Sequence, residues 1–139
     1  MIKILNGIHE TVAYDALSGL KLYHNHEKEN YPVHWHTAVE IILPIRGEYT
    51  VITDGTPHTF YEGDIWITPP GTLHELIAPP DGERLILLFD YSLICNVNAM
   101  DTLLHTLLPY TLISRKEYPE LNSRLQFYLD EVVREYDNP

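Results

Sequence analysis

Short runs of β-forming residues, separated by turn signals, fill this sequence up to about residue 91. The turn signals are Asp54-Gly55, which is typical of a two-residue hairpin, and the stretches EGD at 62–64, PPG at 69–71 and PPDG at 79–82. Many short strands at such spacing favour a β-sandwich or barrel. The runs rich in Val, Ile, Thr and Tyr predict strands at 20–25, 33–36, 39–44, 48–53, 57–61, 64–68, 74–78 and 83–90.

Beyond residue 91 the hydrophobic period changes to that of a helix. Pro119 suits the first turn of a helix predicted over about 117–136, and a weaker helical stretch covers about 99–108. A chain of 139 residues has the size of one domain, so we expect a β-barrel over 1–95 and a helical segment of the same domain over 96–139. The apolar stripe of the longer helix consists of Leu121, Leu125, Tyr128, Leu129, Val132, Val133 and Tyr136.

Composition excludes several classes of protein. The formal net charge of −11 makes direct contact with nucleic acid unfavourable, because phosphate backbones repel an acidic surface. The sequence contains no phosphate-binding glycine loop and no hydrolase nucleophile motif. Its single cysteine, Cys95, excludes an intrachain disulfide. No apolar run is long enough for a transmembrane helix or a secretory signal, so we expect a cytoplasmic protein.

Four side chains form a candidate site. His34, His36 and Glu40 share parity, so in a strand they would all point to one interior, while Trp35, Val39 and Ile41 would point the other way. His74 follows the turn at Pro69 and Gly71 and would join them from another strand. Three imidazoles and one carboxylate suit a divalent metal such as Zn, Fe, Mn or Ni.

These residues resemble the two motifs of the cupin family. The pattern His34-x-His36-x3-Glu40-x6-Gly47 matches the first motif, and Gly63-x5-Pro69-x-Gly71-x2-His74 matches the second, with 15 residues between them. The resemblance implies a double-stranded β-helix, a jelly-roll-like barrel. This sequence departs from the family at Ala78, where the second motif has an asparagine that is not a metal ligand.

With its C-terminal helix, the sequence resembles the N-terminal effector-binding domain of AraC-type transcription regulators. That resemblance implies a domain that senses a small molecule, for example a sugar, and forms a homodimer, while DNA is bound by a module absent from this chain. The competing hypothesis is a small metal-dependent cupin enzyme, an isomerase or a dioxygenase, with His34, His36, Glu40 and His74 as ligands.

The sequence leaves open whether the four site residues bind a metal or only line an effector pocket. A pocket without metal would need hydrogen bonds from the imidazoles to Glu40, because an unpaired buried charge is costly. Tyr49, Trp66 and Arg84 are further candidates for ligand contact, since aromatic faces and a guanidinium suit sugars or carboxylates. His24 and His26 form a second pair of histidines, which we expect at the surface or rim.

Overall fold

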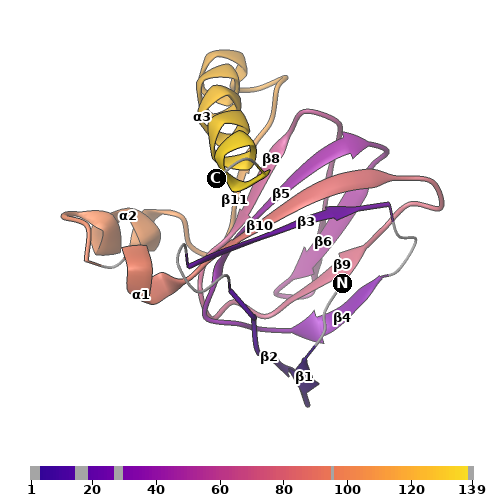
Figure 1. Cartoon of the computed structure of the whole chain (residues 1–139). Coiled ribbons are helices and arrows are strands. Elements are labelled where there is room, and N and C mark those ends of the chain that lie inside the picture. The colour runs from indigo at the N-terminus through magenta and orange to yellow at the C-terminus, as the bar shows by residue number, and fades with distance from the viewer. Residues whose placement is uncertain (1–3, 15–18, 27–29, 95, 138–139) are drawn as a thin grey trace.

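Two antiparallel β-sheets and a long C-terminal helix form the body of the protein (Figure 1). The computed structural model describes residues 4–14, 19–26, 30–94 and 96–137, so Cys95 lies outside the described residues. One sheet has five strands in the order β11-β8-β5-β10-β3, and the other has four in the order β4-β9-β6-β7. The strands of these sheets are β3 (Leu20–Asn25), β4 (Tyr31–His34), β5 (Val39–Arg46), β6 (Tyr49–Thr53), β7 (Thr56–Phe60), β8 (Ile65–Thr68), β9 (His74–Ile77), β10 (Glu83–Phe89) and β11 (Thr111–Ile113).

The main core lies between the two sheets. Alternate residues of each strand point inward, and on β5 and β10 these include Ile42, Ile86 and Leu88. The four-stranded sheet contributes Val51 and Leu76 to the same cluster. This arrangement confirms the prediction of a mainly β, barrel-like fold, because both inner faces are apolar and bury each other.

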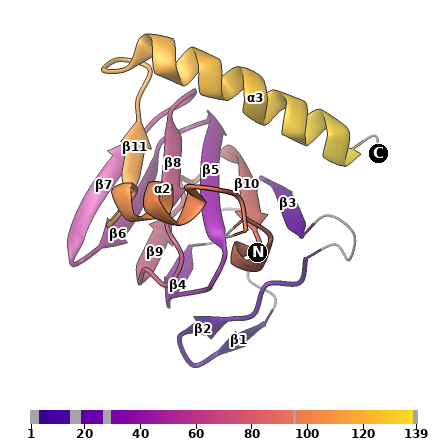
Figure 2. The same cartoon turned by 90° about the vertical axis from the view of Figure 1, so that its left-hand side faces the viewer.

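Helix α3 (Pro119–Asp137) covers the outer face of the five-stranded sheet (Figure 2). Leu125, Leu129 and Val132 pack in a second cluster with outward-facing sheet residues such as Leu43 and Leu87. The helix begins at Pro119 because proline needs no intrahelical N–H bond in the first turn. The helix predicted at 117–136 therefore differs from the observed one by two residues at its start and one at its end.

Most predicted strands lie within two residues of the observed ones, and the hairpin at Asp54-Gly55 is confirmed. Both turn residues have positive φ, 53° for Asp54 and 71° for Gly55. The helix predicted at 99–108 is α2 (Met100–Thr106). Four short elements were not predicted: β1 (Leu5–Asn6), β2 (His9–Glu10), β11 and helix α1 (Tyr91–Ile94).

The strand predicted at 33–36 is wrong in position and in its consequence. Strand β4 begins at Tyr31 and ends at His34, and the chain then bends at Thr37 and Ala38 before β5 begins in the other sheet. His34 and Glu40 therefore belong to different sheets, and a single strand parity cannot relate them. Within β5, Val39 alternates with Glu40 and so points to the other face, as predicted, where it is buried.

The N-terminal hairpin lies at the end of the molecule away from α3 (Figures 1 and 2). Strands β1 and β2 pair antiparallel, and His9 of β2 forms a parallel bridge with Trp35. Two backbone hydrogen bonds fix this contact: Glu10 N–H donates to the Trp35 carbonyl at 2.9 Å, and Trp35 N–H donates to the Ile8 carbonyl at 2.8 Å. The hairpin is thereby attached to the chain segment that carries His34 and His36.

Candidate metal centre

His34, His36, Glu40 and His74 meet in the interior between the sheets. His34 ends β4 and lies opposite His74, the first residue of β9, in the antiparallel pair. Glu40 comes from β5 in the other sheet, and His36 from the bend that joins the two sheets. All four residues are at most 4% exposed. The structure thus brings together all four residues that the sequence analysis proposed as ligands.

The ring of each of the three histidines is oriented by a backbone carbonyl two residues away along the chain. Nδ1 lies 2.7 Å from the Pro32 carbonyl for His34, 3.1 Å from the Ala38 carbonyl for His36, and 2.8 Å from the Thr72 carbonyl for His74. A carbonyl only accepts, so each Nδ1 carries a proton, and a ring in its neutral form has its lone pair on Nε2. Histidines that bind a metal through one ring nitrogen ordinarily make such a hydrogen bond with the other nitrogen.

The three Nε2 atoms face one another. They fall within 4.8 Å of each other, and among the described residues none has a hydrogen-bond partner. Buried polar nitrogens are almost always satisfied in folded proteins, so three orphaned lone pairs at one point need a common acceptor. A cation would satisfy all three nitrogens at once, whereas protonation of His74 would pair only its own Nε2, with Oε2 of Glu40 at 3.1 Å.

Glu40 supplies the negative charge beside the imidazoles. Its Oε2 lies 3.1 Å from Nε2 of His74, and its Oε1 lies 3.9 Å from Nε2 of His36. Burial alone would raise the pKa of Glu40. The charge of His74, a hydrogen bond with His74 and the charges of the other two histidines outweigh burial and lower that pKa to about 2. Burial lowers the pKa of His34 to about 4. The carboxylate is therefore ionised and His34 is neutral at pH 7, the states that metal ligation requires.

A fifth residue, Glu10, completes the cluster, and sequence reasoning missed it. Its Oε1 lies 3.4 Å from Nε2 of His34 and 4.0 Å from Nε2 of His36, and the residue is 6% exposed. Burial, together with the charge of Glu40, raises its pKa to about 7. Glu10 stands outside both motifs, so only its position before an apolar stretch with Val12 and Tyr14 hinted at burial.

Two of the other candidate ligand contacts, Arg84 and Tyr49, are fully buried and lie beside each other. Arg84 is fully buried, with its guanidinium 5.1 Å from the ring centre of Tyr31 and 5.2 Å from that of Tyr49. The Tyr31 ring in turn meets His34 edge-on at 6.4 Å. A buried positive charge therefore lies one aromatic ring away from the histidine cluster.

Trp66 belongs to an aromatic stack. It is fully buried, its ring stacks on Phe60 at 5.3 Å and on Tyr110 at 4.8 Å, and its Nε1 donates to Thr68 Oγ1 at 2.8 Å. Its polar atom and ring are thus already engaged by protein. Packing accounts for this residue without a ligand, although it was proposed as a ligand contact.

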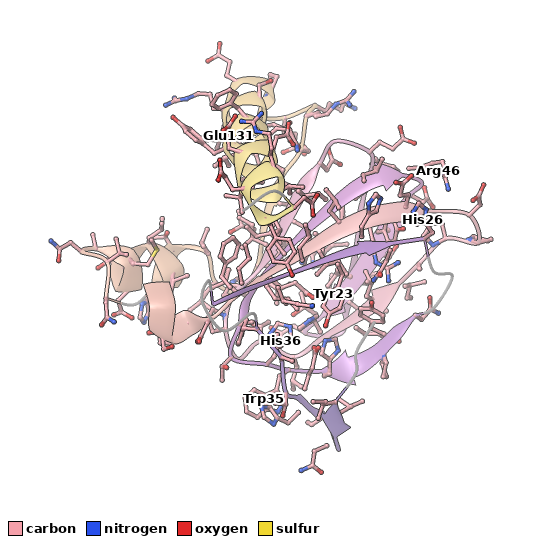
Figure 3. The ribbon with its side chains drawn as sticks, in the orientation of Figure 1. Tyr23, His26, Trp35, His36, Arg46 and Glu131 are labelled. Carbon is pink, nitrogen blue, oxygen red and sulfur yellow. The ribbon has the colours of Figure 1, made fainter. Side chains whose placement is uncertain are left out.

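The second histidine pair lies at the surface, as predicted. The side chains of His24 and His26 are 51% and 62% exposed. Both approach Glu83, with His24 Nε2 2.5 Å and His26 Nε2 3.9 Å from Glu83 Oε2, and Arg46 also contacts this carboxylate. Figure 3 shows His26 and Arg46 at the far edge of the barrel from Trp35, with His36 lying deeper inside.

The fold and the buried cluster define a double-sheet β-barrel with an interior site suited to one divalent metal. Residues 21–89 match the family model described as Cupin domain. The chain therefore contains a cupin domain, which confirms the family indicated by the two sequence motifs.

Among solved structures, the chain is similar to oxalate decarboxylase from Bacillus subtilis, with 26% identity and a TM-score of 0.47 over 55% of this chain and 22% of that one. That protein has Mn(II) centres. A cupin-2 domain containing protein from Shewanella frigidimarina shows 15% identity and a TM-score of 0.48, over 52% of this chain and 72% of that one. The chain thus spans about a fifth of oxalate decarboxylase.

A comparison with curated proteins found no significant match. In the part of the chain that the structure describes, no helix is both long and apolar enough to cross a membrane.

Proposed function

We propose that this chain is a ligand-sensing domain of an AraC-type transcription regulator, and that its effector binds at a divalent metal held by His34, His36, Glu40 and His74. The observation that supports this proposal is the set of three buried Nε2 atoms with no partner among the described residues. Four protein ligands leave coordination positions open, so the metal offers a small molecule a direct binding point inside the barrel.

The surroundings of the cluster suit an effector with an anionic or strongly polar group. Arg84 supplies a buried positive charge over the ring of Tyr31, and that ring in turn meets His34. Burial raises the pKa of Tyr14 to about 12, with the charges of Asp90 and Glu10 adding to the shift, so its hydroxyl stays a hydrogen-bond donor. That hydroxyl is buried and has no hydrogen-bond partner among the described residues. An effector oxygen near the metal would satisfy it.

The regulator assignment rests on the arrangement around the barrel. Helix α3 follows the barrel and packs on it, while Phe127 and Tyr128 on its outer side are 61% and 63% exposed. Large exposed aromatic residues favour a contact with a second copy of the chain. With a net charge of −11, the chain itself is unsuited to DNA, so DNA would be bound by a module outside this sequence.

The test is a calorimetric titration of metal-loaded protein with small sugars and carboxylates. NMR spectra of the same mixtures show whether each compound is converted. A sensor should bind a compound with saturation at one site and leave it chemically unchanged over hours. A ligand has to favour one of two states of the dimer to act as a signal, so sedimentation with and without the compound completes the test. If neither a sugar nor a carboxylate binds to the metal-loaded protein, the proposal is contradicted.

A second candidate is a metal-dependent cupin enzyme, an isomerase or a dioxygenase. The observation that favours it is the donor set itself, because three histidines and one carboxylate leave open positions of the kind that catalytic metal sites require. Metal-dependent conversion of the bound compound in the same NMR experiment would select this function over sensing.

A further inference from the structure

The N-terminal hairpin delivers a carboxylate to the histidine cluster. Strand β2 runs parallel to the chain at Trp35, and the ring of His9 packs on the ring of Trp35 at 4.3 Å on the outside. Neighbouring residues of an extended chain point to opposite sides. His34 and His36, on either side of Trp35, therefore point inward, and so does Glu10, the neighbour of His9.

Glu10 lies within metal-ligand distance of two of the three histidines, His34 and His36. Two ligands that each lie about 2.0–2.2 Å from one ion can be at most about 4.4 Å apart. Glu10 Oε1 is 3.4 Å from Nε2 of His34 and 4.0 Å from Nε2 of His36, so both distances are within that limit. Glu40 satisfies the same limit from the opposite sheet, at 3.1 Å from His74 and 3.9 Å from His36.

We propose that Glu10 is a fifth protein ligand of the metal, supplied by the N-terminal hairpin from outside both cupin motifs. This inference rests on the proposed metal site, and it adds a statement about the ligand. In a six-coordinate sphere, five protein ligands leave one position open. A compound that chelates through two adjacent oxygens has to displace Glu10, whereas a monodentate compound does not.

The chemical class of ligand follows from charge. Loss of Glu10 from the sphere removes one negative charge from the metal, and a carboxylate ligand replaces that charge. A 2-hydroxy or 2-oxo acid provides a carboxylate together with a second oxygen at chelating distance. Such a ligand would detach Glu10 from the cluster and weaken the hydrogen bonds between Glu10 and Trp35 and between Trp35 and Ile8, which hold the hairpin on the barrel together with the ring contact of His9 and Trp35.

Glu10→Gln is the first test, with Co(II) and Mn(II) alone as probes. It should weaken metal affinity at least about 10-fold, the lower end of losses seen even for outer-shell changes. The Co(II) absorption spectrum should also change towards a lower coordination number. Glu10→His, which offers a ring nitrogen in place of the carboxylate, should recover part of the affinity. Glu75→Gln is the matched control, because Glu75 follows His74 in β9 and points to the other face.

The outcomes are distinguishable. Weaker binding and a changed spectrum for Glu10→Gln, with Glu75→Gln unchanged, support the fifth ligand. Wild-type metal binding with an identical affinity and spectrum in Glu10→Gln overturns it and leaves the four-ligand site intact. A wild-type protein that binds no metal overturns both this inference and the proposed function.

The ligand class is tested with glycolate and acetate, which differ by one hydroxyl. On metal-loaded protein, glycolate should speed hydrogen exchange of the Glu10 and Trp35 amides at least about 10-fold, because both amides donate across the hairpin contact. Acetate should leave both amides protected. Equal protection with the two compounds, at concentrations where both bind, overturns displacement by chelation.

Discussion

Oε2 of Glu40 lies 3.1 Å from Nε2 of His74, and these two residues belong to different sheets. Glu40 lies on β5 of the five-stranded sheet and His74 on β9 of the four-stranded sheet. An ion bound between them therefore connects the two halves of the barrel. Metal binding and fold stability are coupled for this geometric reason.

Metal binding should raise the melting temperature of the protein. Saturating metal at 100 times its dissociation constant adds about 2.7 kcal/mol to the free energy of unfolding, because it binds only the folded state. Thermal unfolding with and without Zn(II) or Mn(II) measures this gain, and a chelator should reverse it. The gain should shrink in Glu40→Gln. An equal melting temperature in metal and in chelator would argue against an ion between the sheets.

Metal affinity should increase as the pH rises from about 6 to 8. Burial lowers the pKa of His74, but the Glu40 carboxylate outweighs that effect and raises it above its ordinary value, while the pKa of Glu10 is raised to about 7. Both groups hold protons on the acid side of neutrality, and a metal has to displace them. Calorimetry in buffers of different ionisation enthalpy should show proton release at pH 6 that declines towards pH 8. Release that does not vary with pH would contradict these protonation states.

The metal-free protein should lose stability as the pH rises towards 8. The folded-state pKa of Glu10, about 7, exceeds its ordinary value, so its contribution is complete in acid and is lost as the pH rises through 7. The loss is on the order of 1–3 kcal/mol in the free energy of unfolding. Urea unfolding at pH 5.5 and pH 8 in a chelator measures it. Glu10→Gln should flatten the profile, and an unchanged slope in this variant would assign the effect to another group.

Most of the barrel could be predicted because its strands are marked locally. Val, Ile, Thr and Tyr runs and turn pairs such as Asp54-Gly55 depend on neighbouring residues alone. The end of β4 at His34 and the bend that follows it could not be predicted from neighbouring residues. The bend at Thr37 and Ala38 is set by the crossing between two sheets, which is a property of the tertiary fold.

The four motif residues of the site were identifiable from their spacing, and Glu10 was not. His34, His36, Glu40 and His74 stand at characteristic intervals, whereas Glu10 reaches them through a parallel bridge between its neighbour His9 and Trp35, which are 26 positions apart. Trp66 was proposed as a ligand contact, but the sequence could not distinguish that role from a place in the core. An aromatic residue in a strand is compatible with a pocket wall or with a core, and only its stacking on Phe60 and Tyr110 reveals the core.

Replacement of Trp66 should affect stability rather than metal binding. Trp66→Phe removes the hydrogen bond from Nε1 to Thr68 Oγ1 and leaves a smaller ring in a fully buried stack. We expect a loss of about 1–3 kcal/mol in the free energy of unfolding, with metal content unchanged. Urea unfolding and elemental analysis measure the two effects. A stable variant with weakened effector binding would instead place Trp66 in the pocket wall.

The most direct measurement of the central claim is the metal content of the purified protein by elemental analysis, after loading with Mn, Fe, Ni or Zn and removal of excess metal. We predict close to one equivalent for the wild type and almost none for His36→Ala or His74→Ala. A control, His105→Ala, should keep its metal, because His105 lies on α2 with its side chain 70% exposed, outside the histidine cluster. A wild-type protein that retains no metal, or a content that His74→Ala leaves unchanged, would contradict a metal centre in the barrel.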